Sequence, residues 1–298
     1  MTSASWLWIV FTLIAAAAQT VRNATQRELT TKLGTVGATH VRFLFGLPFA
    51  LLFLAGVTIV SGTSPPHPGL VFVPWVLVGA LTQIAATALM LAAMGARSFV
   101  VAIAYIKTEP IHVALFGLVF LRDHVTPAMA AAILIATAGV VVMSFKPGAM
   151  AGGIRPTVIG LAAGGCFALS AIGYRGAILS LHDSNYVMAA TFTVAIGLAV
   201  QTVLLTTYLF ARDRAVLHAI AKAWRPSLFA GFMGALASQF WFLGFATATA
   251  ASVRTLALVE VLFAQGISRF VFKQKVSARE GIGIVMIVIG VVLLVWSY

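Results

Sequence analysis

The sequence predicts an all-α polytopic membrane protein, with ten transmembrane helices arranged as two inverted five-helix repeats. Composition is the first observation behind this prediction: of 298 residues, 61% are hydrophobic and 9% are charged, and the mean hydropathy is +1.05. Soluble globular chains carry about 25% charged residues, so the composition excludes a water-soluble protein. The second observation is that the apolar residues form runs of roughly the 20 residues that a helix needs to cross a bilayer. The third is that the runs of one half of the chain can be laid upon those of the other.

Each predicted span is an apolar run bounded by charges, prolines or clusters of Gly and Ser. The ten runs cover residues 6–21, 36–60, 70–93, 98–121, 126–145, 157–176, 186–210, 227–248, 250–272 and 279–297. No positive charge precedes the first run, so we expect residues 6–21 to be a retained helix rather than a cleaved signal peptide. The longest connection, residues 211–225, places apolar side chains at helical spacing opposite Arg212, Lys222 and Arg225. This pattern indicates a helix lying in the membrane interface.

The two halves, residues 1–148 and 149–298, are the expected five-helix repeats. A shift of 151 residues lays the spans of the first half on those of the second, and it superposes Glu109 on Glu260 and Gly139 on Gly290. Each half then carries a carboxylate midway along its fourth span. Because an odd number of spans per half orients the halves oppositely, the repeat would have inverted topology.

The basic residues are distributed unevenly between alternate connections. The connections after spans 1, 3, 5, 7 and 9 contain Arg22, Arg27, Lys32, Arg97, Lys146, Arg155, Arg212, Arg214, Lys222, Arg225, Lys273, Lys275 and Arg279. The connections after spans 2, 4, 6 and 8 contain only Arg122 and Arg175. The positive-inside rule places the first set in the cytoplasm, so we expect both termini to face outward. The net charge of +12 is then an orientation signal and implies no nucleic-acid partner.

Motifs for enzymatic chemistry do not occur in the sequence. It contains no Gly-rich phosphate loop, no HExxH and no Cys/His metal spacing, so we expect no enzymatic activity, no cofactor and no metal. The single cysteine, Cys166, excludes an intramolecular disulfide. A selective ion channel is also unsupported, because no carbonyl-filter signature is present.

Ionisable residues inside spans are the first candidates for function, since each costs at least a few kcal/mol to insert. In span 4, Tyr105, Thr108, Glu109 and His112 fall at i, i+3, i+4 and i+7 and would share one helical face. Lys107 would point about 200° away from Glu109, so these two neighbours are not expected to pair with each other.

Pro110 is expected to remove a helical hydrogen bond, bend span 4 near the bilayer centre and open it toward a cavity. Arg254 and Glu260 of span 9 are the candidate partners of the span 4 charges. Two roles stay open for Glu109: an ion pair for assembly, or binding of a substrate or proton.

Other polar residues complete the candidate site. For Arg42, in span 2, snorkelling to the headgroups and a functional role both stay open, whereas Arg269, near the end of span 9, is expected to snorkel. The uncharged polar and aromatic candidates for substrate contact are Gln19, Gln83, Tyr174, Gln239 and Trp241. Together with the charges they would line a mostly apolar pocket with few polar groups, which suits a small amphipathic ligand.

Two segments carry a resemblance to a known family. They are GARSFVVAIAYIKTEPIHVALFGLVFLRDHVTPAMAAAILIATAGVVVM, from Gly95, and its counterpart ATAASVRTLALVEVLFAQGISRFVFKQKVSAREGIGIVMIVIGVVLLV. Each has a small-residue turn into a fourth span, a polar or Pro interruption, a charged turn, and a last span ending in Gly and a Val-rich run. In this pattern the chain resembles the drug/metabolite transporter superfamily, specifically its ten-span group built from two EamA-type repeats, over essentially its whole length.

The resemblance implies a multi-pass carrier of the cell inner (plasma) membrane. Such a carrier would export small organic metabolites by alternating access through a central cavity. The expected metabolites are amino acids, aromatic amino acids among them. The carrier's expected partners are a small-molecule substrate and the lipid bilayer, and it is expected to function as a monomer. Relatives in this group usually have cytoplasmic termini, whereas the charges here predict the reverse.

Alternative functions remain at this point. A multidrug efflux transporter for cationic compounds would need an unpaired carboxylate, and a non-transporting membrane scaffold would need an extramembrane surface. Small four-span relatives couple export to protons through a carboxylate in their first span, but spans 1 and 6 here contain no Asp or Glu. We therefore expect facilitated or weakly coupled export, with Glu109 or Glu260 as the candidate proton carrier.

Overall fold

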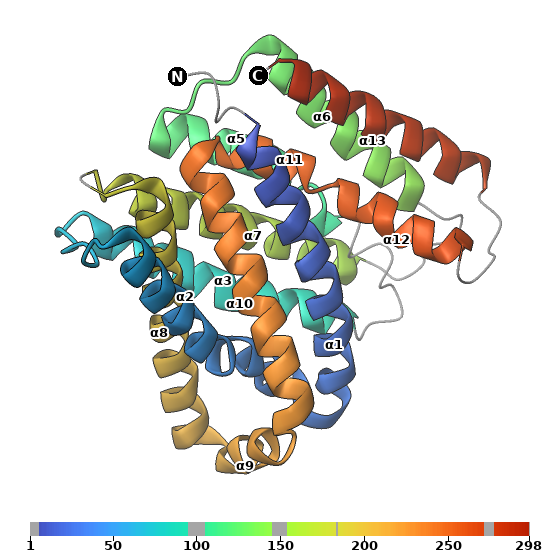
Figure 1. Ribbon diagram of the computed structural model, residues 1–298. Helices are drawn as coiled ribbons and strands as arrows, with labels where there is room; N and C mark the ends of the chain where they lie inside the picture. The colour runs from blue at the N-terminus through green and yellow to red at the C-terminus, as the bar shows by residue number, and fades with distance from the viewer. Residues whose placement is uncertain (1–5, 95–104, 145–153, 183, 271–276, 298) are drawn as a thin grey trace.

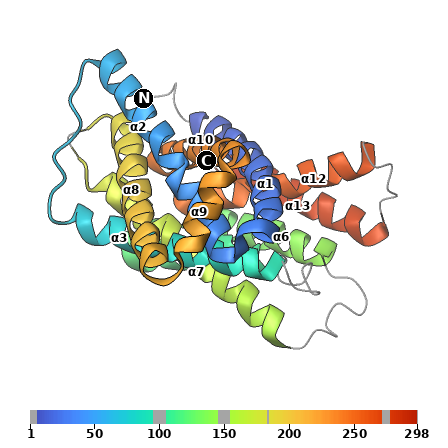
Figure 2. The same ribbon diagram turned by 90° about the horizontal axis from the view of Figure 1, so that it is seen from below.

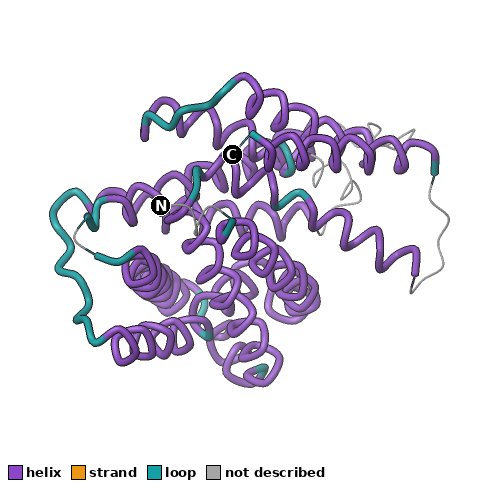
Figure 3. Tube along the Cα trace, turned by 45° about the horizontal axis from the view of Figure 1, so that its top comes forward, coloured by secondary structure: helices purple, strands orange, loops and turns teal. Residues whose placement is uncertain are grey.

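The structure is a computed structural model that describes residues 6–94, 105–144, 154–182, 184–270 and 277–297. In these ranges the chain is almost entirely helical, and its longest non-helical connection joins α2 to α3 (Figure 3). The helices are α1 (Leu7–Leu44), α2 (Gly46–Ser61), α3 (Phe72–Met94), α5 (Glu109–Phe116), the π-helix η1 (Gly117–Leu121), α6 (Pro127–Ser144), α7 (Ile154–Leu179), α8 (Tyr186–Arg212), α9 (Arg214–Lys222), α10 (Trp224–Thr247), α11 (Ala250–Leu256), α12 (Val259–Phe270) and α13 (Ala278–Trp296).

Eight helical segments in the described part of the chain are long and apolar enough to cross a membrane. Their outward faces carry large apolar side chains, such as Ile59, Val60 and Val203, which are 80%, 89% and 63% exposed. So much exposed apolar surface is suited to lipid rather than water. The fold is therefore that of an all-helical, multi-pass membrane protein. The predicted spans 98–121 and 250–272 are not among the eight: in their described parts, residues 105–121 and 250–270, the chain is divided into shorter helices.

α1 is longer than the sequence predicted because it consists of two helical arms joined at Gly34. Gly34 has φ 68° and ψ 175°, a backbone conformation that only glycine adopts without strain. Across this bend, Gln26 Nε2 donates a hydrogen bond of 2.9 Å to the carbonyl oxygen of Ala38. The prediction that Arg22 lies in a loop is wrong: the first apolar segment extends through Gln26, and Arg22 lies inside it, 1% exposed.

Arg175 also lies inside a helix rather than in the predicted connection. α7 continues to Leu179, and the Arg175 guanidinium reaches the end of α10, where Nη1 donates to the carbonyl oxygens of Phe245 and Ala248. Its Nη2 lies 3.2 Å from Asp123 Oδ1, beyond the end of η1. Arg175 therefore ties α7 to two other elements and caps the C-terminal carbonyls of α10.

Helices far apart in sequence pack in close pairs: α1 with α10, α3 with α7, and α6 with α13 (Figure 1). Glycines allow the close approach. A Cβ built at Gly173 of α7 would lie 2.5 Å from the backbone nitrogen of Gly79 of α3. A Cβ at Gly139 of α6 would lie 2.8 Å from the carbonyl oxygen of Gly283 of α13. Small residues at such contacts are typical of helix packing in membranes.

The predicted amphipathic helix is present as α9, which lies at one end of the molecule beside α8 and α10 (Figures 1 and 2). Asp213 caps its N-terminus by accepting a hydrogen bond of 3.3 Å from the backbone nitrogen of Val216. Ile220 is buried on its apolar face, and Val216 packs beside Gly37 of α1. The start of α1 and the end of α13 lie at the other end of the molecule (Figure 1).

Candidate functional site

Two interrupted helices each present a carboxylate directly after the interruption. In the first, Lys107 and Thr108 form a turn, and α5 begins at Glu109. In the second, α11 ends at Leu256, residues 257–258 form a turn, and α12 begins with Glu260 in its first turn. A carboxylate in the first turn of a helix is stabilised by the partial positive charge of the helix N-terminus.

Where a bend at Pro110 was predicted, the structure has a two-residue turn, Lys107 and Thr108, and a new helix begins directly after it. Pro110 occupies the first turn of α5, where the missing backbone N–H needs no helical partner. Because the helix restarts at Glu109, Tyr105, Thr108, Glu109 and His112 do not share one unbroken helical face. The Thr108 hydroxyl donates to the carbonyl oxygen of Tyr105, and His112 Nδ1 lies 3.1 Å from the carbonyl oxygen of Thr108.

The four charged residues pair across the two interrupted helices. Arg254 Nε of α11 lies 3.0 Å from Glu109 Oε1 of α5, and the Lys107 ammonium contacts Glu260 Oε1 of α12. Each base thus pairs with the acid of the other interrupted helix, and Lys107 does not pair with its neighbour Glu109. The Arg254–Glu109 contact is an ion pair without hydrogen-bond alignment of these two atoms. All four side chains are at most 20% exposed.

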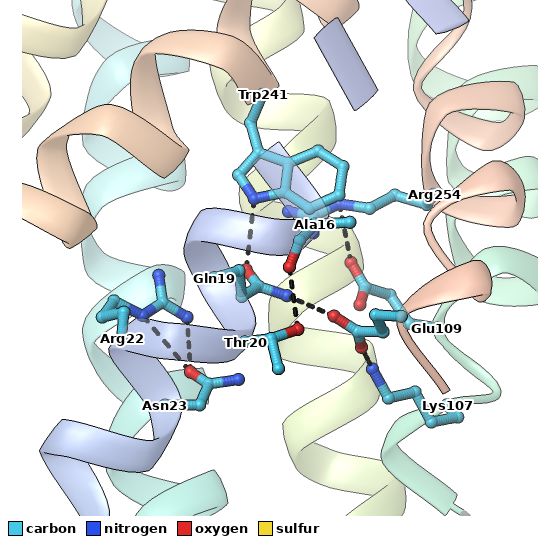
Figure 4. A network of polar contacts seen from close by, with 10 residues as sticks. Ala16, Gln19, Thr20, Arg22, Asn23, Lys107, Glu109, Trp241 and Arg254 are labelled. Carbon is cyan, nitrogen blue, oxygen red and sulfur yellow. Dashed lines mark hydrogen bonds and ion pairs between the residues drawn. The ribbon is translucent and has the colours of Figure 1, made fainter. Parts of the chain in front are cut away.

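Gln19 of α1 and Trp241 of α10 extend the network of the four charged residues to two further helices (Figure 4). Gln19 Nε2 donates a hydrogen bond of 3.3 Å to Glu260 Oε2, and Trp241 Nε1 donates one of 3.1 Å to Gln19 Oε1. The guanidinium of Arg254 lies over the Trp241 ring, 4.5 Å from its centroid, in a cation–π contact. The polar network therefore joins α1, α10, both interrupted helices and the turns beside them.

A cavity of about 20 Å³ lies inside this network. It is lined by Gln19, Lys107, Glu109, Pro110, Arg254, Ala257, Leu258 and Glu260. That volume accommodates about one water molecule, whereas pockets for organic ligands measure about 300–1,000 Å³. In this conformation the charged side chains hold one another, and the site is closed to an organic solute.

Six of the predicted site residues do not line this cavity: Tyr105, His112, Gln83, Tyr174, Gln239 and Trp241. Three of the six, Gln83, Tyr174 and Gln239, bond helices to one another. Gln83 of α3 accepts hydrogen bonds from the Tyr174 hydroxyl (3.4 Å) and from Gln201 Nε2 of α8 (2.9 Å). Gln239 Nε2 of α10 donates a hydrogen bond of 2.7 Å to the Thr191 hydroxyl of α8. Interhelical hydrogen bonds of this kind are common between buried amides in membrane proteins.

Two further arginines lie beside the network. The sequence analysis placed Arg22 in a connection and left both snorkelling and a functional role open for Arg42. Arg22 follows Gln19 by one turn of α1, and Gln26 follows Arg22 by another, so the three share one face of the helix. Arg42, on the second arm of α1, is 2% exposed and donates a hydrogen bond of 3.1 Å to the Thr87 hydroxyl, so it does not snorkel. The helical spacing of Gln19, Arg22 and Gln26 could have indicated that Arg22 belongs to the site. It was not used, because the predicted span ended before Arg22. The Arg269 side chain lies outside the described residues.

Comparison with known proteins supports the fold and goes no further. No family model matches the chain, and no curated protein matches it. A crystal structure described only as that of a protein is similar over 99% of this chain and 99% of its own, with a TM-score of 0.69 and 14% sequence identity. At that identity the likeness is one of fold alone.

Proposed function

We propose that the protein is a carrier of the cell inner membrane that exports small organic solutes by alternating access. It would do so in the manner of the ten-span EamA-type transporters that its sequence resembles. The proposed solutes include amino acids, aromatic amino acids among them. The observation that carries the proposal is the crossed pairing of Arg254 with Glu109 and of Lys107 with Glu260 at two interrupted helices. Because charges inside a membrane protein are costly, such residues usually serve a function. Carriers commonly build their binding sites at interrupted helices.

The proposal includes ten spans in two inverted repeats, and the packing of α6 with α13 supports it. A Cβ at Gly139 would lie 2.8 Å from the Gly283 carbonyl oxygen, and one at Gly290 would lie 2.8 Å from the Ala132 carbonyl oxygen. These two contacts are related by the same 151-residue shift that relates Glu109 to Glu260. The close pairing of α3 with α7 corresponds in the same way to that of α10 with α1.

An amino acid fits the chemistry of the closed site. A zwitterion brings one ammonium and one carboxylate, so its ammonium can replace a base at Glu109 or Glu260 while its carboxylate binds a basic group of the site. The number of buried charges of each sign then stays balanced, which limits the desolvation cost. The aromatic faces of Trp241 and Phe245, on which Arg254 already lies, are suited to an aromatic side chain.

A carrier for organic cations is less well supported. Both carboxylates have a basic partner in this structure, so a cation without a carboxylate would have to release Lys107 or Arg254 and leave that base unpaired. Removing one partner of a buried ion pair costs about 3–5 kcal/mol.

The proposed cycle needs the closed network to open on one side of the membrane at a time. The ion pairs join the interrupted helix of one half to that of the other, so a solute that replaces them would loosen the contact between the halves. Export would be facilitated, or weakly coupled through protonation of Glu109 or Glu260.

Uptake into proteoliposomes tests the proposal. We expect purified full-length protein to transport radiolabelled phenylalanine, with competition by other amino acids and weak competition by aromatic cations. Glu109→Gln and Lys107→Met are expected to abolish transport, whereas Glu28→Gln, on the exposed surface of α1, serves as the matched control. Equal competition by aromatic cations would favour the multidrug alternative. Absence of transport of any solute would favour the scaffold.

A further inference from the structure

Arg22 and Arg42 are two buried cations whose hydrogen-bond partners are all neutral. Arg22 is 1% exposed, and its Nε and Nη2 donate to Asn23 Oδ1 at 3.2 and 2.7 Å. Arg42 is 2% exposed and donates through Nη1 to the Thr87 hydroxyl. One buried donor nitrogen of each has no hydrogen-bond partner: Nη1 of Arg22 and Nε of Arg42.

The carboxylates in the described part of the chain are committed elsewhere. Glu109, Glu260 and Asp123 pair with Arg254, Lys107 and Arg175. Asp213 and Glu280 cap α9 and α13, and Glu28 is exposed on α1. Neither Arg22 nor Arg42 therefore has an acidic partner among the described residues, although every other buried cation of the site has one.

The two arginines lie together and beside the ion-pair network. Both side chains flank Gly234 of α10: a Cβ there would lie 3.2 Å from Arg42 Cγ and 3.5 Å from Arg22 Cδ. Their positive charges act on each other and on Arg254. Figure 4 shows the Arg22 guanidinium on one side of Gln19 and the Lys107 ammonium on the other.

This arrangement is unfavourable as a purely structural feature. Two like charges repel each other in a medium of low dielectric constant, and apolar side chains of similar volume usually stabilise such a position. Guanidinium groups with unused donors are, however, well suited to bind a carboxylate through paired, charge-assisted hydrogen bonds. The buried positive charge then acquires the counter-charge that this part of the chain does not supply.

We propose that Arg22 and Arg42 form the anion subsite of this protein and bind the carboxylate group of the transported solute. The solute class is thereby narrowed: a carboxylate is required for binding, whereas an ammonium group is not. As a statement about transport, the inference rests on the proposed function. As a statement about binding, it can be tested alone.

The test measures the melting temperature of the purified full-length protein in detergent with three probes that share one ring. 3-Phenylpropanoate has the carboxylate alone, phenethylamine has the ammonium alone, and phenylalanine has both. A ligand that binds the folded state raises Tm. We expect 3-phenylpropanoate and phenylalanine to raise the Tm of the wild-type protein, and phenethylamine to leave it unchanged.

Arg22→Met and Arg42→Met are expected to lose this stabilisation, with affinity for 3-phenylpropanoate falling at least about tenfold. Without ligand, their Tm should equal or exceed that of the wild type, because an unpaired buried charge has been removed. Arg22→Lys and Arg42→Lys keep the charge without the bidentate geometry, and they provide the test if the Met variants do not fold. The matched control is Arg214→Gln on the exposed surface of α9, which should retain the full shift.

The inference would be overturned by no stabilisation of the wild type by either carboxylate, by stabilisation that persists in the Arg22 and Arg42 variants, or by equal stabilisation by phenethylamine. Stabilisation by chloride alone would also overturn it and assign the site to an inorganic anion. If the carboxylates bind as expected but no probe is transported, the proposed function fails and the anion subsite stands.

Discussion

Arg254 Nε lies 3.0 Å from Glu109 Oε1, although the two residues are 145 positions apart: Glu109 begins α5 and Arg254 lies in the last turn of α11. Arg254→Met is expected to leave the Glu109 carboxylate buried without its base, which lowers stability by about 3–5 kcal/mol. The double variant Arg254→Met/Glu109→Gln should recover most of that loss without recovering transport. Thermal unfolding of the single and double variants measures the coupling between the two residues. Strictly additive losses would show that the pair does not interact.

Gln19 links the Trp241 indole to the Glu260 carboxylate, and its removal tests whether the network acts as a unit. Gln19→Leu deprives Trp241 Nε1 of its acceptor and Glu260 Oε2 of a donor, so we expect a stability loss of about 1–3 kcal/mol. Transport should fall as well, because Glu260 loses a positioning contact. Thr25→Val, at a half-buried position of the same helix outside the network, is the control. A Gln19 variant with wild-type stability and wild-type uptake would show that this link has no role.

The contact between α6 and α13 depends on glycine at position 139. Gly139→Ala would place a Cβ 2.8 Å from the backbone carbonyl oxygen of Gly283, so the helices would have to separate. Overpacking of this kind costs about 1–3 kcal/mol. The same substitution at Gly281 of α13, where a Cβ meets nothing within 4 Å, should be neutral or stabilise the protein by about 0.4–1 kcal/mol. Equal melting temperatures for the two variants would contradict this packing.

The orientation in the membrane follows from the basic connections. Although Arg22 is buried, three other bases of the predicted cytoplasmic set are exposed: Lys32 near the bend of α1, Lys222 at the end of α9 and Arg225 in the first turn of α10. We expect a reporter that is active only outside the cytoplasm to be active when fused after Tyr298. Activity of a reporter restricted to the cytoplasm would reverse the assignment.

Hydropathy predicted most of the fold, because each long apolar run can satisfy its backbone in a membrane only as a helix. It could not locate the interruption before Glu109. In sequence, Pro110 is equally compatible with a kink inside one helix and with the first turn of a new one. The interruption before Val259 has no proline at all, so the sequence offers no local signal for it.

The charged part of the site was predictable for the same reason that it is unusual: Lys107, Glu109, Arg254 and Glu260 are ionisable residues inside apolar runs. Arg22 was not predicted as a site residue, because the predicted span ends where the first charge occurs. In the structure, α1 continues past Arg22. Gln83 and Gln239 could not be separated from Gln19 by sequence. All three are lone amides in apolar helices, and only their neighbours determine which one reaches the carboxylates.

The most direct test of the central claim, that the crossed ion pairs form the substrate site of an alternating-access carrier, is solute counterflow. Proteoliposomes preloaded with unlabelled phenylalanine should accumulate external radiolabelled phenylalanine transiently, because a carrier exchanges solute across a single site. We predict counterflow for the wild type and for Glu28→Gln, and none for Glu109→Gln. Counterflow that persists in both Glu109→Gln and Glu260→Gln, or none in the wild type with any carboxylate-bearing solute, would contradict the account.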